Sequence, residues 1–228
     1  MTAETITLFG HWICPFSVRV EFALAQRGIE YSMIEVPPRA ARPKDFVVPE
    51  EFIAHSPKLE VPMVKHAGEY LADSIPILEK LEEWYSDNSL LPAEGAAQSL
   101  VHARVQWLDK FLYRPMVGVY YGTDEEKIAE SSVQFGLALD TIAGWLRETM
   151  WVAGEQPTIA EAIMVGMYTR LDGLYRLGLT APLPKEVAQH RTQCESLVGW
   201  NSVAWSPQQT DEFVGRFIKF REIQNSQK

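Results

Sequence analysis

The sequence predicts an α/β domain followed by an all-α domain, and three observations carry this prediction. Residues 1–85 alternate between strand-like and helix-like patterns in the order β-α-β-α-β-β-α. Residues 86–95 are polar and interrupted by proline and glycine, as is typical of a linker. Residues 96–228 contain only helical periodicities. We therefore expect two domains, 1–85 and 96–228, joined by the linker 86–95.

The α/β part starts with a short strand at residues 5–9 and a helix over residues 15–27. Proline at the first helical position and glycine just after the last are typical of helix ends, and Pro15 and Gly28 stand there. The apolar stripe of this helix comprises Phe16, Val20, Ala23 and Leu24. The sequence then predicts a strand at 31–36, a proline-rich loop at 37–43, a helix at 50–55, a hairpin of 62–66 and 69–72, and a helix opened by Asp73 and Ser74.

The second part shows successive helical stripes. The first comprises Val101, Val105, Leu108 and Leu112, and the second comprises Phe135, Leu139, Ile142 and Leu146. Thr158 and Glu161 have the spacing of a capping box, and Pro115 predicts a kink in the first long helix. Further helices are expected at 184–198 and 210–223.

Composition and charge narrow the class of protein. The chain has 228 residues, a formal net charge of −9 and a pI near 5.1, and an acidic surface repels nucleic acid. Its apolar runs are too short to span a bilayer, and no secretion signal is recognisable. Two cysteines, Cys14 and Cys194, do not make a disulfide framework. We therefore expect a cytoplasmic protein without nucleic acid or membrane partners.

Cys14 stands directly before Pro15, where the first strand gives way to a helix. The free N–H groups and the dipole of a helix N-terminus stabilise an anion, and they lower a thiol pKa from about 8.5 to between about 3.5 and 7.5. Cys14 is therefore a candidate nucleophile. The alternative is a small buried apolar side chain, which is what we expect of Cys194 in the middle of a helix.

Ser17 occupies the position at which a second cysteine would close a disulfide with Cys14. A serine cannot resolve a mixed disulfide, so an adduct on Cys14 must be released by a second thiol molecule. This favours a monothiol mechanism. The alternative for Ser17 is an ordinary residue in the first turn of the helix.

Several motifs occur along the chain in the same order as in one known protein family. They are CPFSVRVEFAL at 14–24, PEEFIAHSP at 49–57, Val61-Pro62, Asp73-Ser74, Leu90-Leu91-Pro92 and the capping box at Thr158. Together they resemble the cytosolic glutathione transferases over nearly the whole chain. The first motif is similar to the omega class and to plant dehydroascorbate reductases. The resemblance implies a thioredoxin-like N-terminal domain that binds glutathione and an all-helical C-terminal domain that carries the co-substrate pocket.

The resemblance also implies roles for individual residues. By this resemblance Cys14 is the catalytic residue, and no metal is expected. The co-substrate glutathione is expected to contact Phe16, Val61, Pro62, Asp73 and Ser74. A cis bond before Pro62 turns the chain so that the Val61 backbone pairs with the cysteinyl part of glutathione. Ser74 and its helix N-terminus take the γ-glutamyl carboxylate, and Asp73 takes the ammonium group. The alternative for Pro62 is an ordinary proline in an edge strand. The alternative for Asp73 and Ser74 is that they only cap the helix that follows.

The other end of glutathione lacks its usual partner in this sequence. Members of the family place a lysine at one of two positions to bind the glycyl carboxylate, and this chain has Val48 and Glu60 there. The candidates that replace the lysine are Lys44, His55 and Lys58. The choice among them stays open.

One face of the first long helix carries aromatic and basic residues, namely Arg104, Trp107, Phe111, Arg114 and Tyr121. Such a face suits a flat or anionic electrophile. It predicts a co-substrate pocket with Arg104, Trp107, Phe111 and Tyr121. The alternative is that these side chains pack within the domain.

Three functions are compatible with these motifs. The first is an enzyme, a Cys-dependent glutathione transferase for thiol transfer, reduction or deglutathionylation of small-molecule glutathione adducts. The second is conjugation, isomerisation or ether cleavage, with glutathione itself as the nucleophile. The third is a non-catalytic interaction protein, a type that tends to lose the cysteine and the acidic-serine pair kept here. The expected partners are glutathione and a small electrophilic or disulfide substrate, and the resemblance implies a homodimer.

Overall fold

The computed structural model describes residues 5–93 and 95–226, which form two compact units. The first contains the described residues up to Leu91 together with Leu197–Val203. The second contains Pro92–Ser196 and the described residues from Ala204 onward. Parts of the expected domains and linker, namely residues 1–4, Glu94 and residues 227–228, lie outside the described residues.

The first unit is built on one mixed sheet with the strand order β2-β1-β3-β4. Its strands are β1 (Ile6–Gly10), β2 (Tyr31–Glu35), β3 (Met63–His66) and β4 (Glu69–Ala72). The strands β1 and β2 are parallel, and the other two pairs are antiparallel. With α1 (Pro15–Gln26), α2 (Glu50–His55) and α3 (Ser74–Trp84), this confirms the predicted order of elements. A short 3₁₀ turn, η1 (Arg39–Ala41), lies in the proline-rich loop and was not predicted.

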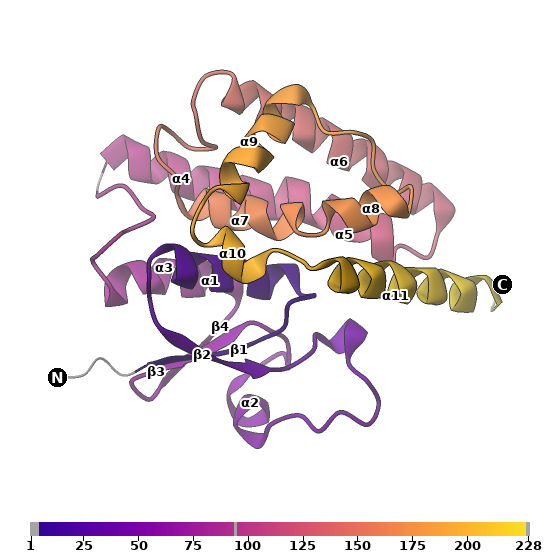
Figure 1. The fold of residues 1–228 in the computed structure, drawn as a ribbon, viewed down its shortest axis with the longest axis horizontal. Coiled ribbons are helices and arrows are strands. Elements are labelled where there is room, and N and C mark those ends of the chain that lie inside the picture. The colour runs from indigo at the N-terminus through magenta and orange to yellow at the C-terminus, as the bar shows by residue number, and fades with distance from the viewer. Residues whose placement is uncertain (1–4, 94, 227–228) are drawn as a thin grey trace. The chain divides into compact units, whose positions relative to one another are not determined.

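Helices cover both faces of the sheet, with α1 and α3 on one side and α2 on the other (Figure 1). Phe9 of β1 meets Phe52 of α2 with ring centroids 5.9 Å apart. The buried cluster around this pair comprises Phe9, Cys14, Val36, Phe52, Val61 and Met63. The α2 side of the sheet therefore brings Cys14 and Val61 into one cluster.

A segment from far along the chain completes the first unit. Leu197–Val203, which includes α10 (Trp200–Val203), packs on α1. The backbone N–H of Gly199 donates a hydrogen bond to Gln26 Oε1 at 3.0 Å. A Cβ on Gly199 would lie 2.6 Å from the carbonyl oxygen of Phe22, so only glycine allows this approach. No local pattern in the sequence predicted this contact.

The described secondary structure of the second unit is helical apart from an isolated β-bridge between Trp151 and Gly154. Its helices are α4 (Gly95–Trp107), α5 (Arg114–Tyr121), α6 (Glu125–Leu146), α7 (Ile159–Tyr168), α8 (Leu171–Arg176), α9 (Lys185–Glu195) and α11 (Pro207–Ser226). The predicted capping box forms at Thr158 and Glu161. A π-helical turn, η2 (Leu108–Tyr113), lies between α4 and α5, just ahead of Pro115. Proline lacks the N–H that an α-helix requires there, which accounts for the irregular turn.

A polar cluster lies inside the second unit. The Glu161 carboxylate accepts a hydrogen bond from the backbone N–H of Val152 at 2.8 Å and lies 3.5 Å from His190 Nε2. The other ring nitrogen of His190 lies 2.9 Å from the hydroxyl of Tyr168. Cys194 Sγ lies 3.8 Å from the same ring, and burial raises the pKa of this thiol well above its ordinary value. Cys194 is therefore a buried neutral thiol, as expected.

Among residues 5–93 and 95–226, no helix combines the length and the apolar composition that a membrane crossing requires.

Candidate functional site

Cys14 lies at the start of α1, as the sequence predicted. It occupies the N-cap position with extended backbone angles, φ −83° and ψ 116°, and Pro15 follows in the first helical turn. Its backbone N–H donates to the carbonyl of His11 at 3.0 Å, and its own carbonyl accepts from Val18 at 3.1 Å. These two bonds hold the backbone of Cys14 in the turn between β1 and α1.

The thiol of Cys14 contacts the segment before β3. Its Sγ donates a hydrogen bond to the carbonyl oxygen of Val61 at 3.6 Å. The bond between Val61 and Pro62 is cis, as predicted. Cys14 and Val61 are both buried, with exposed fractions of 3% and 5%. The structure therefore brings these two predicted site residues together.

Asp73 shows a backbone conformation that is uncommon for a residue with a side chain. Its φ is 72°, and its N–H donates to the carbonyl of Pro62 at 3.3 Å, which joins it to the cis-proline segment. Asp73 stands at the N-cap of α3, but its side chain makes no capping bond there, contrary to expectation. The carboxylate pairs with Lys58 Nζ at 2.8 Å instead. The side chains of Lys58 and Asp73 are 69% and 56% exposed, so solvent screens this pair.

Ser74 follows Asp73 and is buried at the start of α3. Its hydroxyl oxygen accepts a hydrogen bond from Arg19 Nη1 at 3.1 Å. Arg19 is fully buried in α1, and its guanidinium lies 4.6 Å from the ring centroid of Phe16. Because the Ser74 oxygen acts as an acceptor, its proton stays available for donation to an anion. The sequence motif contained Arg19, but nothing in the motif indicated this contact.

The three candidate cations for a glycyl carboxylate lie in different surroundings. Lys44 is exposed and forms no hydrogen bond or ion pair with the described part of the chain. His55 stacks on Tyr70 with ring centroids 3.6 Å apart. Lys58 is engaged by Asp73. The structure therefore does not bring these three side chains to one place.

Arg42, in the proline-rich loop, is a further cation near these residues, and no motif in the sequence indicated it. Its Nε donates to the carbonyl of Pro37 at 3.1 Å, and its Nη2 donates to the carbonyl of Leu59 at 3.2 Å. These bonds fasten the proline-rich loop to the chain just before Val61. The guanidinium thus lies beside Leu59, which precedes Glu60, one of the two positions where the resemblance led us to expect a lysine.

Ser17 faces the sheet. Its side chain is fully buried, and its hydroxyl has no hydrogen-bond partner among the described residues. A Cβ on Gly10 would lie 3.2 Å from the Ser17 Cβ, so β1 and α1 approach closely at this point. These contacts favour the interpretation of Ser17 as a packing residue of the first helical turn.

The aromatic face of the first long helix divides into two groups. Arg104 lies 3.4 Å from the ring centroid of Trp145, which also meets Trp107 edge-on at 4.7 Å. Phe111 contacts Trp107 at 5.3 Å between ring centroids and is 43% exposed. Tyr121 instead meets two side chains of α11, Phe217 and Phe220. Three of the four predicted pocket residues therefore share a cluster, and Tyr121 belongs to another.

Within the described ranges, no group of three or more His, Cys, Asp or Glu side chains has an arrangement suited to a metal ion.

Comparison with known proteins supports the thioredoxin-like assignment of the first unit. Residues 13–84 match the family described as glutathione S-transferase, N-terminal domain. Glutathione S-transferase U7 of Arabidopsis thaliana is 27% identical over 129 residues, which are 56% of this chain and 53% of that protein. The chain thus spans about half the length of that relative. The probable glutathione S-transferase parA of Nicotiana tabacum is 24% identical over 86% of this chain and 88% of its own length.

Solved structures show the same fold along the chain. A tau-class glutathione S-transferase from mango, Mangifera indica, superposes with a TM-score of 0.77 at 17% identity and covers 95% of this chain and 98% of its own. Glutathione transferase Omega 3C from Trametes versicolor superposes with a TM-score of 0.75 at 18% identity, covering 96% and 92%. Both classes share the architecture, so the fold does not distinguish between them. The chain therefore has the architecture of the glutathione S-transferases, a thioredoxin-like N-terminal domain followed by a helical C-terminal domain, and its residues 13–84 match the N-terminal domain of that family.

Proposed function

We propose that this chain is a glutathione-dependent transferase in which the Cys14 thiolate is the nucleophile. Its reactions would be thiol transfer, reduction or deglutathionylation of small-molecule glutathione adducts. The observation that carries the proposal is the position of Cys14 at the N-cap of α1, directly before Pro15 in the first helical turn. A thiol at a helix N-terminus is stabilised as the anion by the dipole and the first N–H groups.

In this proposal glutathione lies along the segment from Val61 to Ser74. The Val61 backbone pairs with the cysteinyl part of the peptide, as an added strand would. The γ-glutamyl ammonium group displaces Lys58 from Asp73, and the Ser74 hydroxyl donates to the γ-glutamyl carboxylate. Arg19 acts as a positioning residue, because its hydrogen bond orients the Ser74 side chain. The ring of Phe16 packs against the Arg19 guanidinium.

For the glycyl carboxylate we propose Arg42 and Lys44. Arg42 is fastened to Leu59 beside the replaced lysine positions, and Lys44 follows it in the same loop with no competing partner among the described residues. His55 is held by Tyr70, and Lys58 is held by Asp73, so both are less suited to this role.

The proposed chemistry has two balanced steps. In the first, the Cys14 thiolate attacks the glutathionyl sulfur of a mixed disulfide between glutathione and a small thiol. The new bond joins Cys14 to glutathione, and the small thiol leaves as its thiolate. In the second, the thiolate of another glutathione attacks the glutathionyl sulfur, releases glutathione disulfide and regenerates the Cys14 thiolate. Buried Ser17 takes no part, in keeping with a monothiol mechanism.

A second candidate is conjugation of glutathione to a small electrophile. The relatives named glutathione S-transferase favour it, and so does the S–H of Cys14, which acts as a hydrogen-bond donor in the structure. In this reaction the sulfur of glutathione attacks the electrophile, and Cys14 only donates a hydrogen bond to the glutathione thiolate. The cluster of Arg104, Trp107 and Phe111 would contribute to the co-substrate pocket in either reaction. From the resemblance to the glutathione transferases we also expect a homodimer.

The two candidates differ in what Cys14→Ser does. We expect this variant to lose the reduction of a glutathione mixed disulfide with 2-mercaptoethanol, while it still binds to immobilised glutathione. Cys194→Ser is the matched control and should keep the activity, because Cys194 is buried in the other unit. A Cys14→Ser variant with full reductase activity would instead favour a different nucleophile. Failure of the unmodified protein to bind glutathione would favour a non-catalytic interaction protein.

A further inference from the structure

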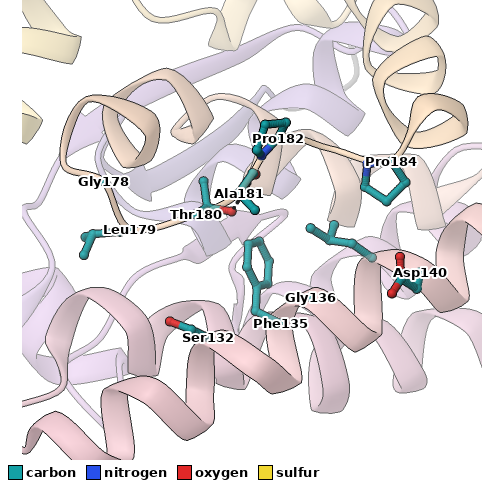
Figure 2. A pocket seen from close by; sticks show the side chains of 11 residues that line it. Ser132, Phe135, Gly136, Asp140, Gly178, Leu179, Thr180, Ala181, Pro182 and Pro184 are labelled. Atoms are coloured by element: carbon teal, nitrogen blue, oxygen red, sulfur yellow. Dashed lines mark hydrogen bonds between the residues drawn. The ribbon is translucent and has the colours of Figure 1, made fainter.

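A pocket of about 510 Å³ lies within the second unit, between α6 and the segment that joins α8 to α9 (Figure 2). Its lining comprises Ser132, Phe135, Gly136, Leu139 and Asp140 of α6 and Gly178, Leu179, Thr180, Ala181, Pro182 and Pro184 of the joining segment. Binding sites for small molecules commonly have volumes of about 300–1,000 Å³. The pocket is therefore large enough for a ligand with one or two rings.

The apolar part of the lining comes from both sides of the pocket. In Figure 2 the ring of Phe135 rises from α6 toward the joining segment, where Ala181 and Pro182 lie. Leu139 lies one helical turn further along α6, and Pro184 lies on the opposite wall. An aromatic ring and two prolines form flat apolar walls, which suit a flat apolar group.

The polar part of the lining is small and carries a single sign of charge. Among the residues that line the pocket, Asp140 is the one with a charged side chain. Its carboxylate has no hydrogen-bond or salt-bridge partner in residues 5–93 and 95–226, and neither does the hydroxyl of Ser132. The hydroxyl of Thr180 already donates to the carbonyl of Ala181 at 3.2 Å. The Asp140 carboxylate is thus an open anionic acceptor at one end of the pocket, and Ser132 lies eight residues, or about 12 Å, away along α6.

Gly136 lines the pocket between Phe135 and Asp140 with backbone atoms alone, because it has no side chain. A Cβ at this position would meet nothing within 4 Å, so packing inside the chain does not require glycine here. Glycine is less favourable than alanine in the middle of a helix. Its presence leaves bare backbone at a point where a ligand can approach closely.

We propose that this pocket binds a small organic monocation, a primary ammonium group joined to one aromatic ring by a short alkyl chain. The ring lies against Phe135, Pro182 and Pro184, and the ammonium group donates to the Asp140 carboxylate. The net charge of −9 adds a long-range attraction for cations and disfavours anions. All of these residues belong to the second unit, so this site shares no residue with the proposed glutathione site.

The first experiment compares three probes of similar shape by isothermal titration calorimetry with the full chain. They are 2-phenylethylammonium, the neutral 2-phenylethanol and the anion 3-phenylpropionate. We expect the cation to bind about fivefold more tightly than the alcohol, as for a partly exposed charge pair, and the anion to bind more weakly still. Equal affinity for the three probes, or a preference for the anion, would overturn the proposal.

Variants of α6 then locate the binding site. Asp140→Asn should lower the affinity for the cation to that of the alcohol, whereas Glu130→Gln, which removes an exposed charge from the same helix outside the pocket, should change it less than twofold. Gly136→Leu should fill the pocket and abolish binding while the melting temperature stays at or above that of the unmodified protein. Equal effects of Asp140→Asn and Glu130→Gln, or full binding by Gly136→Leu, would place the cation elsewhere.

A competition experiment separates this site from the glutathione site. The titration is repeated with glutathione at saturating concentration, and we expect the affinity for 2-phenylethylammonium to be unchanged. Displacement of the probe by glutathione would show that the probe occupies the glutathione site, and this would overturn the proposal. Because the probe is measured directly, the result does not depend on which reaction Cys14 performs.

Discussion

The sulfur of Cys14 lies 3.6 Å from the carbonyl oxygen of Val61, although 47 positions separate the two residues in the chain. One stands at the N-terminus of α1, and the other precedes a cis-proline at the start of β3. A thiol is thereby placed beside backbone groups that can pair with a peptide.

Asp73 should contribute to glutathione binding more than to stability. Asp73→Ala removes an exposed ion pair with Lys58, and such pairs contribute about 0–1 kcal/mol to the free energy of unfolding. In the proposed complex with glutathione the same carboxylate binds an ammonium group, and a charged hydrogen bond contributes about 1.5–3 kcal/mol. Calorimetric titration should therefore show glutathione affinity lowered by at least about tenfold.

Lys58→Met is the matched control for that measurement. It breaks the same ion pair but leaves the Asp73 carboxylate in place. Its glutathione affinity should stay equal to that of the unmodified protein or rise. If Lys58→Met weakens glutathione as much as Asp73→Ala does, the assignment of the ammonium group to Asp73 is wrong.

Ser74 should matter for folding as well as for binding. Its hydroxyl accepts a hydrogen bond from Arg19, whose side chain is fully buried. Ser74→Ala leaves one buried donor without its acceptor, which costs about 1–3 kcal/mol. Thermal unfolding without glutathione should show a lowered melting temperature, and Ser74→Thr, which keeps a hydroxyl, should recover most of it. A melting temperature unchanged by Ser74→Ala would contradict the role of Arg19 in positioning this side chain.

Glu21 should make the stability of the first unit depend on pH. Burial raises the pKa of its carboxyl above the ordinary value of 4.5, and the hydrogen bond from Tyr31 opposes this effect only in part. A carboxyl with a raised pKa in the folded state stabilises the fold at low pH, and this contribution is lost as the pH rises through the folded pKa. Glu21→Gln should therefore raise the melting temperature at pH 7 but not below the unfolded pKa.

The control for this prediction is Glu30→Gln, at an exposed position directly before β2, the strand that begins with Tyr31. It should leave the dependence of the melting temperature on pH unchanged. A constant difference between Glu21→Gln and the unmodified protein at all pH values would show that the Glu21 carboxyl is not perturbed.

Elements with a strong local pattern were predictable from the sequence. The strand before Cys14, the helix opened by Pro15 and the capping box at Thr158 depend on neighbouring residues, and each formed where it was expected. The docking of Leu197–Val203 on α1 was not predictable, because the close approach of Gly199 to Phe22 is a contact between distant parts of the chain. The short helices α8 and α10 also lack the length that a periodic pattern requires.

The same distinction applies to the candidate site. The motifs identified Cys14, Asp73 and Ser74 as candidate site residues. In the structure these residues lie at the starts of α1 and α3. The partners of these side chains came only from the tertiary structure. Lys58 is 15 positions from Asp73. Arg19 is 55 positions from Ser74. Arg42 donates a hydrogen bond to the backbone carbonyl of Leu59. Because every residue has a backbone carbonyl, such a contact cannot be recognised from the sequence.

The proposed nucleophile is tested most directly by locating the glutathione adduct. The protein is incubated with glutathione disulfide near neutral pH, and its mass and peptide map are recorded. We predict one added glutathione, carried by Cys14 and removed by fresh glutathione. Cys194 should stay unmodified, because it is fully buried and burial raises the pKa of its thiol. An adduct on Cys194, or the absence of any adduct on folded protein that binds glutathione, would contradict the assignment of Cys14 as the nucleophile.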